Sequence, residues 1–197
     1  MLVRSILVMA LATVIAGCAG AIDYDYTKEP DPRKAEFVIG ASDALRITVW
    51  KNPELSTEAK VRPDGTVTMP LVGDVHAVGR TPTQLQSEIT KRLGAFVKEE
   101  TAQVTVAVTE VNSYRFTVAG NVEKPGIFTS RYYVTVAEAI ALAGGLNRFA
   151  SPRGVVVVRS ESSGRVRKIP FDYSRISAGE HPEENLALMS GDTLFVQ

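Results

Sequence analysis

The sequence predicts an α+β fold of two small mixed-sheet units with one helix each, the second of the β-grasp kind. Short stretches in which apolar and polar residues alternate predict half-buried strands. Two capping boxes, which begin at Thr81 and Thr135, each open a stretch with helical spacing. Turn sequences such as Pro63-Asp64-Gly65 separate these elements. Several strands grouped around one helix are typical of the α+β class.

The first 17 residues have the composition of a bacterial signal peptide. Arg4 gives a positive start, an apolar stretch over residues 6–15 follows, and two small residues precede Cys18. The apolar stretch is too short to span a bilayer, which takes about 20 residues. Cys18 is the only cysteine, and its position resembles the lipobox of bacterial lipoproteins. We therefore expect lipid attachment at Cys18, with an ordinary secretory signal as the alternative.

The residues after the cysteine predict a lipidated tether and its destination. Ala19, and not aspartate, follows Cys18, which by the usual lipoprotein sorting pattern favours the periplasmic face of the outer membrane. Residues 18–36 contain prolines and charged residues without a sustained apolar period, so we expect a tether that holds the folded body off the membrane. The two predicted folded units then occupy residues 37–111 and 112–197.

The charge balance excludes some classes of partner. The chain has 22 basic and 22 acidic residues, and loss of the signal peptide removes only Arg4, which leaves 21 against 22. A protein without a basic excess cannot neutralise many phosphates, so nucleic acid is not an expected partner. After the signal peptide no apolar run approaches 18 residues, so we expect no membrane-spanning helix of its own. No sequence motif calls for a cofactor.

The first unit is expected to contain four strands and one helix. Its helix begins at Thr81 and places four apolar side chains on one stripe: Leu85, Ile89, Leu93 and Phe96. The predicted strands lie at residues 45–50, 66–69, 75–78 and 103–109.

The second unit is expected to follow the same scheme. Its helix begins at Thr135 and ends at Gly144-Gly145, a pair that suits a helix C-terminus. The continuous apolar run at residues 155–158 predicts a central strand that is covered on both faces. The other predicted strands lie at residues 114–119, 127–129, 166–169 and 191–196. A weak echo links the units, because Ser42-Asp43-Ala44-Leu45 and Gly191-Asp192-Thr193-Leu194 both read as a turn that leads into a strand.

Four segments resemble known domains. Residues 37–50 (FVIGASDALRITVW) and 61–73 (VRPDGTVTMPLVG) resemble the polysaccharide biosynthesis/export domain. Residues 120–126 (GNVEKPG) and 139–146 (AIALAGGL) resemble the SLBB domain, a soluble ligand-binding β-grasp. The chain thus looks like a member of the Wza-like outer-membrane polysaccharide export family. It departs at Ser42, where the family usually has glycine.

The resemblance implies a function without catalysis. It implies a periplasmic, outer-membrane-anchored subunit of a capsule or exopolysaccharide export channel, which assembles as a homo-oligomeric ring. Its expected partners are the polysaccharide and an inner-membrane polysaccharide co-polymerase. Longer relatives carry a C-terminal amphipathic helix that forms the pore, and this sequence stops at Gln197 without one. We therefore expect a short form that works with a separate outer-membrane β-barrel porin.

Six polar or aromatic residues are candidates for contact with a glycan or a hydrated lumen. Arg46, Thr48, Arg115 and Thr117 lie on the polar faces of predicted strands, and Tyr132 and Tyr133 lie in a loop. Tyr24 and Tyr26 are further aromatic residues, in the predicted tether. A solvated outer face would explain the four strand residues equally well, and the tyrosines could instead line a subunit contact or be ordinary tether and loop residues.

Other chemistries have weaker support. His76 and His181 lie in different units, so a metal site is not expected. Paired carboxylates would suit a glycan hydrolase, but the four candidates all fall in predicted turns, where aspartate is a turn-former: Asp43, Asp64, Asp74 and Asp192. Two rival functions stay open, a monomeric lipid-anchored module that binds a glycan or a partner, and a periplasmic glycan hydrolase.

Overall fold

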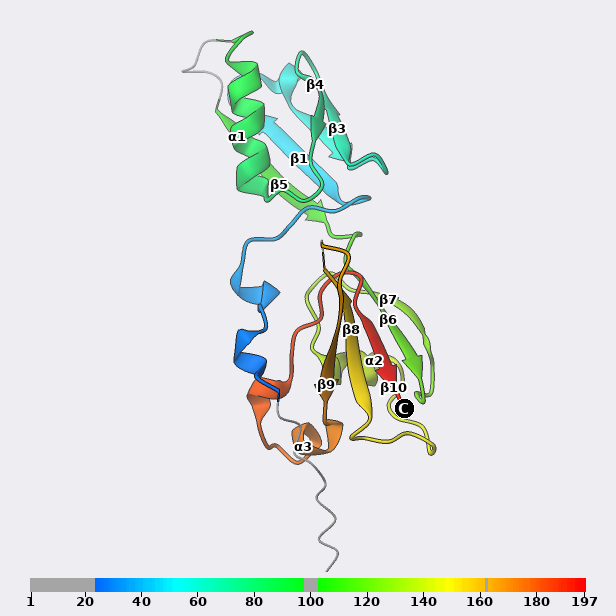
Figure 1. Cartoon of the computed structure of the whole chain (residues 1–197). Coiled ribbons are helices and arrows are strands. Elements are labelled where there is room, and N and C mark those ends of the chain that lie inside the picture. The colour runs from blue at the N-terminus through cyan, green and yellow to red at the C-terminus, as the bar shows by residue number, and fades with distance from the viewer. Residues whose placement is uncertain (1–23, 98–102, 162) are drawn as a thin grey trace, which may run out of the picture.

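The computed structural model describes residues 24–97, 103–161 and 163–197, and it has the predicted α+β class. The described residues form two units that follow one another along the long axis of the molecule (Figure 1). Each unit has its own cluster of buried apolar side chains. From Tyr24 the chain runs beside the second unit, crosses to the first and then returns (Figure 1).

The first unit combines a three-stranded sheet with a two-stranded hairpin. In the sheet, β1 (Ala44–Val49) lies between β2 (Thr57–Lys60) and β5 (Val104–Glu110). The hairpin pairs β3 (Thr66–Met69) with β4 (Gly73–His76). Every second residue of β1 is buried, as the alternation predicts. All three pairings are antiparallel, so the mixed pairing expected of both units occurs only in the second.

Helix α1 (Pro82–Leu93) packs against β5 and begins as predicted. The Thr81 hydroxyl accepts a hydrogen bond from the Gln84 amide at 3.3 Å, and the Gln84 side chain accepts one from the Thr81 amide at 3.0 Å. Three of the four predicted stripe residues are fully buried: Leu85, Ile89 and Leu93. The prediction for Phe96 is wrong. The helix ends at Leu93, so the helical spacing no longer applies, and Phe96 is 58% exposed.

The second unit is built on a five-stranded mixed sheet. Its strand order is β7-β6-β10-β8-β9, in which β10 runs parallel to β6 and antiparallel to β8. The last strand of the chain therefore lies in the centre of the sheet. The bounds are β6 (Arg115–Gly120), β7 (Gly126–Thr129), β8 (Val155–Ser160), β9 (Val166–Phe171) and β10 (Thr193–Val196).

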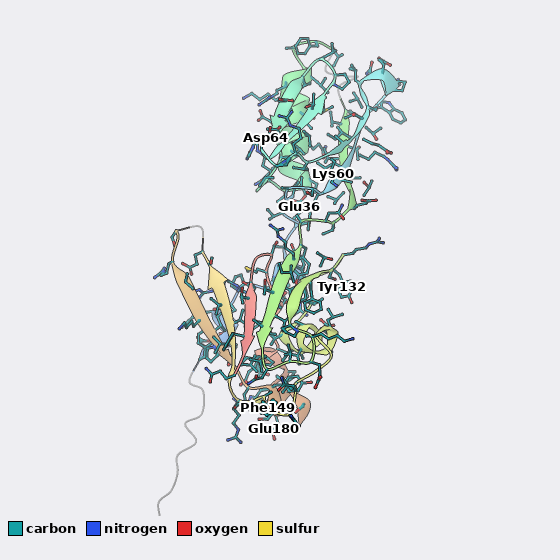
Figure 2. All side chains as sticks on the ribbon, turned by 90° about the vertical axis from the view of Figure 1, so that its right-hand side faces the viewer. Glu36, Lys60, Asp64, Tyr132, Phe149 and Glu180 are labelled. Carbon is teal, nitrogen blue, oxygen red and sulfur yellow. The ribbon has the colours of Figure 1, made fainter. Side chains whose placement is uncertain are left out.

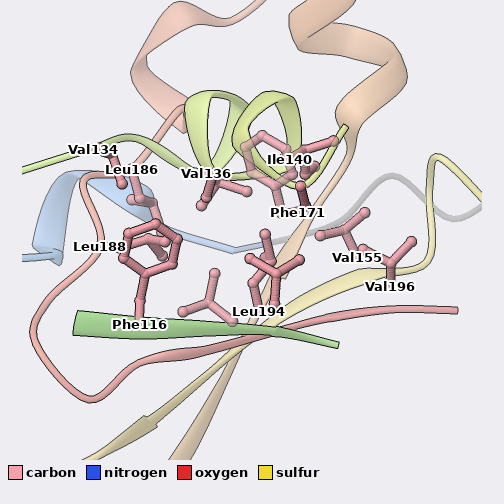
Figure 3. Close-up of a cluster of buried hydrophobic side chains, with 14 of the residues drawn as sticks. Phe116, Val134, Val136, Ile140, Val155, Phe171, Leu186, Leu188, Leu194 and Val196 are labelled. Atoms are coloured by element: carbon pink, nitrogen blue, oxygen red, sulfur yellow. The ribbon is translucent and has the colours of Figure 1, made fainter. Parts of the chain in front are cut away.

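Helix α2 (Val136–Leu142) covers one face of this sheet and encloses the core. The capping box at its start is formed, with Thr135 and Glu138 bonded in both directions. Figure 3 shows apolar side chains from the helix, the sheet and the following loop meeting in one layer, among them Phe116, Ile140 and Leu194. A further short helix, α3 (Tyr173–Ser177), was not predicted.

The expectation that residues 155–158 are covered on both faces is wrong. Val155 and Val157 are buried, whereas Val156 and Val158 are half-exposed. Strand β8 has hydrogen-bonded neighbours on both sides, but only one face of the sheet carries the core. Position inside a sheet and cover on both faces are therefore separate properties, and the apolar run signals only the first.

Residues 24–36, predicted as part of the tether, pack on the folded body: Tyr26 and Glu29 bind the second unit, and Glu36 binds Thr83 of the first unit. Tyr26 is 7% exposed, and its hydroxyl donates a hydrogen bond to the Pro170 carbonyl at 2.8 Å. The Glu29 side chain is 3% exposed. The prediction of a spacer is therefore wrong for these residues, because buried partners far along the chain bind its side chains. The predicted signal peptide (1–17), Cys18 and residues 19–23 lie outside the described residues.

Four short 3-10 helices complete the described secondary structure, at Tyr26–Lys28, Pro32–Lys34, Pro53–Leu55 and Pro182–Glu184. Across the described ranges, no helix combines the length and apolar character that a bilayer crossing requires.

Candidate functional site

A cleft of about 640 Å³ opens where the two units meet. Three parts of the chain line it: the segment from Pro30 to Ser42, the crossover at residues 112–115, and the turn at residues 189–191. Tyr133, from the loop before α2, completes the wall. The volume of the cleft is in the range of small-ligand sites, which often lie between domains. Glu36 and Tyr132 mark the level of the junction in Figure 2.

Asp43 joins the first unit to the crossover beside this cleft. The carboxylate is fully buried and accepts four hydrogen bonds at 2.7–2.8 Å, from the amides of Gly40, Asn112 and Ser113 and from the Ser113 hydroxyl. The backbone reaches this geometry because Ser42 adopts φ 75°, in the left-handed region. A carboxylate with several backbone donors is a strong local anchor. The path of the chain between the units is therefore fixed at this point.

Aromatic side chains form a wall of the cleft. The Tyr133 ring lies 5.0 Å from that of Tyr114 in a T-shaped arrangement and 6.5 Å from that of Phe37. Burial raises the pKa of Tyr133 above its ordinary value and raises that of Tyr114 to about 12. Both hydroxyls therefore stay protonated at physiological pH. The Tyr114 hydroxyl is occupied, since it donates to the Leu188 carbonyl and accepts from the Val134 amide.

Some charged groups around the cleft have partners among the residues that the structure describes, and one does not. Asp31 pairs with Arg33 at 2.9 Å, and Glu36 accepts hydrogen bonds from the amide and hydroxyl of Thr83 at the start of α1. Arg115 also lines the cleft, and within the described part of the chain no hydrogen bond or ion pair engages its guanidinium. Arg115 is thus a cation available to an incoming ligand.

The structure brings only part of the predicted contact set together. Arg115 and Tyr133 line the cleft, and Tyr132 is 66% exposed on the neighbouring loop. Thr117 lies further along β6, where it pairs with Ile127 of β7 and Thr193 of β10 on the uncovered side of the sheet. The remaining two residues, Arg46 and Thr48, are exposed on β1 of the first unit, where Arg46 forms an ion pair with Glu58 at 2.8 Å.

Sequence reasoning missed a buried ionic cluster that holds the N-terminal segment. The Glu29 carboxylate accepts hydrogen bonds from Arg159 at 3.1 Å and from Arg167 at 2.8 Å. Arg159 also binds Asp192 at 2.7 Å, and the side chains of this pair are 6% and 2% exposed. Each ion is paired, as burial requires. The only signal in the sequence was a glutamate among prolines, which reads as solvated linker.

The four turn aspartates are poor candidates for acid–base catalysis. Asp43 is saturated by its four donors, and Asp192 is held by Arg159 and the Met189 amide. Hydrogen bonds from Thr66 and Arg62 lower the pKa of exposed Asp64 to about 2, and a hydrogen bond from Thr68 lowers that of Asp74. A general acid needs a raised pKa. Asp64 and Asp74 therefore lack the raised pKa of a general acid, and the carboxylates of Asp43 and Asp192 are occupied by other groups of the protein.

The groups at the cleft suit binding. They comprise aromatic faces, amide and hydroxyl groups, the carboxylates of Asp31 and Glu36, and the Arg115 guanidinium, which pairs with no described residue. In the ranges that the structure describes, no group of three or more histidine, cysteine and acidic side chains is placed to hold a metal ion. Two folded units, a mixed β-grasp sheet and a cleft lined by aromatic, polar and charged side chains define the class: a two-unit α+β protein with a cleft between the units that suits binding.

Two family models match the chain in succession. The polysaccharide biosynthesis/export protein model matches residues 31–109, and the SLBB domain model matches residues 115–170. The boundary between the matches falls at the crossover that Asp43 holds. The chain therefore belongs to the polysaccharide biosynthesis/export family and carries an SLBB domain.

Curated relatives bear related names. The EPS I polysaccharide export outer membrane protein EpsA of Ralstonia solanacearum is 31% identical over 135 residues, which cover 56% of this chain and 35% of EpsA. The exopolysaccharide production protein ExoF of Rhizobium meliloti is 31% identical over 128 residues, 59% of this chain and 30% of ExoF. The capsule polysaccharide export outer membrane protein CtrA of Neisseria meningitidis is 26% identical over 88% of this chain and 47% of CtrA. The chain thus spans less than half the length of each of these relatives, between 30% and 47%.

Proposed function

We propose that this protein is a periplasmic, outer-membrane-anchored subunit of a channel that exports capsular polysaccharide or exopolysaccharide. The observation that carries the proposal is the succession of a polysaccharide export domain and an SLBB domain in one folded body. The alignment with CtrA, named as a capsule polysaccharide export outer membrane protein, runs through both domains.

The proposed anchor is a lipid on Cys18. Several acyl chains hold a protein on a membrane far more firmly than one, at about 0.8 kcal/mol per buried methylene. We expect Cys18→Ser to leave a folded protein in the soluble periplasmic fraction, whereas the wild type sediments with the outer membrane. A Cys18→Ser protein that still sediments with the outer membrane would contradict the lipid attachment.

The proposed conduit is a homo-oligomeric ring that guides the polymer without catalysis. A hydrated polymer must move on, so weak and repeated contacts suit it better than one tight site. Arg115 and Tyr133 are the proposed glycan contacts, because they combine an unpaired cation with an aromatic face in one cleft. An inner-membrane co-polymerase would deliver the polymer, with synthesis as the driving force, and a separate outer-membrane β-barrel porin would release it.

Assembly state separates this proposal from the rival binding module. Rings arise when heterologous contacts between subunits close. Native mass spectrometry of the lipidated protein in detergent is expected to show one multimer of defined size. A protein that stays monomeric, also after cross-linking in cells, would favour the module that binds a glycan or a partner without forming a channel.

Two further measurements test the contacts and the absence of catalysis. Arg115→Ala and Tyr133→Ala are expected to lower the amount of exported polymer several-fold, while Arg165→Ala, an exposed arginine paired only with Glu161, leaves export unchanged. Incubation of the protein with the purified polysaccharide is expected to release no new reducing ends. New reducing ends would favour the glycan hydrolase.

A further inference from the structure

The part of the chain that remains between the proposed anchor and the folded body is short. Tyr26 is buried, Glu29 is held by two arginines and Tyr24 packs against the same core, so the folded body includes the chain from Tyr24 onward. Five residues separate Cys18 from Tyr24. An extended chain spans at most about 3.5 Å per residue, so Tyr24 lies within roughly 20 Å of the lipidated cysteine. A body tied this closely stands on the membrane surface.

The N-terminal segment reaches the second unit at one particular end. The Tyr26 hydroxyl binds the Pro170 carbonyl near the end of β9, directly before α3. In Figure 1 this end, with α3 and the C-terminus, lies opposite to the first unit. The end of the second unit that carries α3 is therefore the part of the body nearest the proposed anchor.

The loop at residues 147–153 presents an exposed aromatic and basic surface at this same end. Phe149 is 68% exposed, and the Arg148 guanidinium lies 4.6 Å from the centre of its ring. The Arg153 side chain is 69% exposed. Figure 2 places Phe149 at the end of the molecule away from the first unit, with Glu180 close by. The loop is therefore the basic part of an end that also carries an acidic residue.

The loop is held in place by backbone contacts. The Tyr173 amide donates to the Pro152 carbonyl at 2.8 Å, and the Phe149 amide donates to the Asn147 side chain at 2.9 Å. Asn121 binds the Phe149 carbonyl from the neighbouring loop at 3.3 Å. The exposed ring thus projects from a fixed backbone. A surface of this kind presents its side chains to a partner without a cost of ordering the loop.

We propose that the loop Asn147–Arg153 is a membrane-contact surface, with Phe149 at the level of the phospholipid headgroups and the arginines next to the phosphates. Aromatic rings favour the interface between headgroups and acyl chains, and basic side chains favour anionic lipid. The loop and the short connection to Cys18 together orient the protein, with the second unit on the membrane and the first unit pointing away. This inference rests on the lipid anchor of the proposed function.

The test uses single-tryptophan forms of the lipidated protein. Trp50 is the only native tryptophan and lies at the end of β1 in the first unit. Two reporters are made in a Trp50→Phe background, Phe149→Trp for the loop and Ala21→Trp for the anchor. Each protein is reconstituted into vesicles of phosphatidylethanolamine and phosphatidylglycerol whose acyl chains are brominated close to the headgroup. Fluorescence is compared with that in the same vesicles without bromine.

We expect the brominated lipid to remove most of the emission of Phe149→Trp and Ala21→Trp. The emission of Trp50, measured in the wild-type protein, is expected to stay unchanged. Quenching of Ala21→Trp without quenching of Phe149→Trp would overturn the membrane-contact surface while the anchor stands. Absence of quenching at Ala21→Trp would overturn the anchor itself, and with it the inference. Quenching of Trp50 to the same extent as Phe149→Trp would overturn the proposed orientation.

Discussion

Asp43 shows how one buried side chain connects two folded units. Its carboxylate accepts hydrogen bonds from two amides of the crossover, Asn112 and Ser113, and from the amide of Gly40, three residues before it. Asp192 repeats the local part of this arrangement, because it accepts from the Met189 amide three residues before it. The sequence echo between the two segments thus corresponds to one turn geometry with different distant partners.

Asp43→Asn is expected to lower the free energy of unfolding by about 3 kcal/mol. The amide nitrogen would face N–H donors, and the charge-assisted hydrogen bonds would be lost. Urea denaturation measures the change, and limited proteolysis around residues 110–113 shows whether the crossover loosens. Asp64→Asn is the control, since the Asp64 carboxylate is exposed and solvent screens its interactions. Equal effects of the two changes would contradict the special role of Asp43.

Ser42 tests the local geometry of the same turn. Its φ of 75° lies in the left-handed region, where a residue with a Cβ atom is strained, and the equivalent Gly191 has φ 89°. We expect Ser42→Gly to raise the free energy of unfolding by about 1 kcal/mol. The reverse exchange, Gly191→Ser, should lower the free energy of unfolding by a similar amount. No atom lies within 4 Å of the added Cβ, so the backbone strain is the only cost. A Ser42→Gly protein less stable than the wild type would contradict this account.

At the scale of elements, the predictions that held depended on near neighbours. Both capping boxes formed because Thr81 and Gln84, like Thr135 and Glu138, bind partners three residues away. The N-terminal segment was misread because its partners are distant in sequence. Glu29 binds an arginine 130 residues further on, which no local pattern can indicate.

The walls of the cleft also differ in how far apart in sequence their contacts lie. Arg115 and Tyr133 were selected as polar and aromatic residues on a strand and a loop, and both line the cleft. The opposite wall, formed by the segment that contains Asp31 and Phe37, was not predicted. Contacts with residues far along the chain hold that wall: Tyr26 and Glu29 attach the segment to the second unit, and Glu36 binds Thr83 of α1.

Glu29→Gln tests the attachment of this segment. Glutamine keeps the shape of the side chain but removes the negative charge that pairs with Arg159 and Arg167. We therefore expect the free energy of unfolding to fall by about 2 kcal/mol. Hydrogen exchange of the amides over residues 26–36 is expected to rise, while exchange in β1 stays as in the wild type. Glu54→Gln, at an exposed position, serves as the matched control. Unchanged protection over residues 26–36 would contradict the attachment.

At the scale of the whole molecule, buried tyrosines predict a loss of stability in alkali. Burial raises the pKa of Tyr24, Tyr26 and Tyr114 to about 12, from 10.0 in an exposed tyrosine. Between these values the unfolded chain releases protons that the folded protein keeps. The free energy of unfolding therefore falls as pH rises through this window, and it is insensitive to these groups below it.

Urea denaturation at a series of pH values between about 9 and 12 measures this slope, which is set by the difference in bound protons. Tyr26→Phe and Tyr114→Phe should each make the fall less steep, because each removes one group that titrates differently in the two states. Slopes identical to that of the wild type in both variants would show that other groups cause the alkaline loss.

The whole-molecule claim is that polysaccharide needs this subunit to reach the cell surface. The most direct measurement is the amount of surface polysaccharide in a strain that lacks the gene and has no second family member. We predict that surface polymer disappears, that a wild-type copy restores it, and that a Cys18→Ser copy does not. Normal surface polysaccharide in the deletion strain would contradict the account.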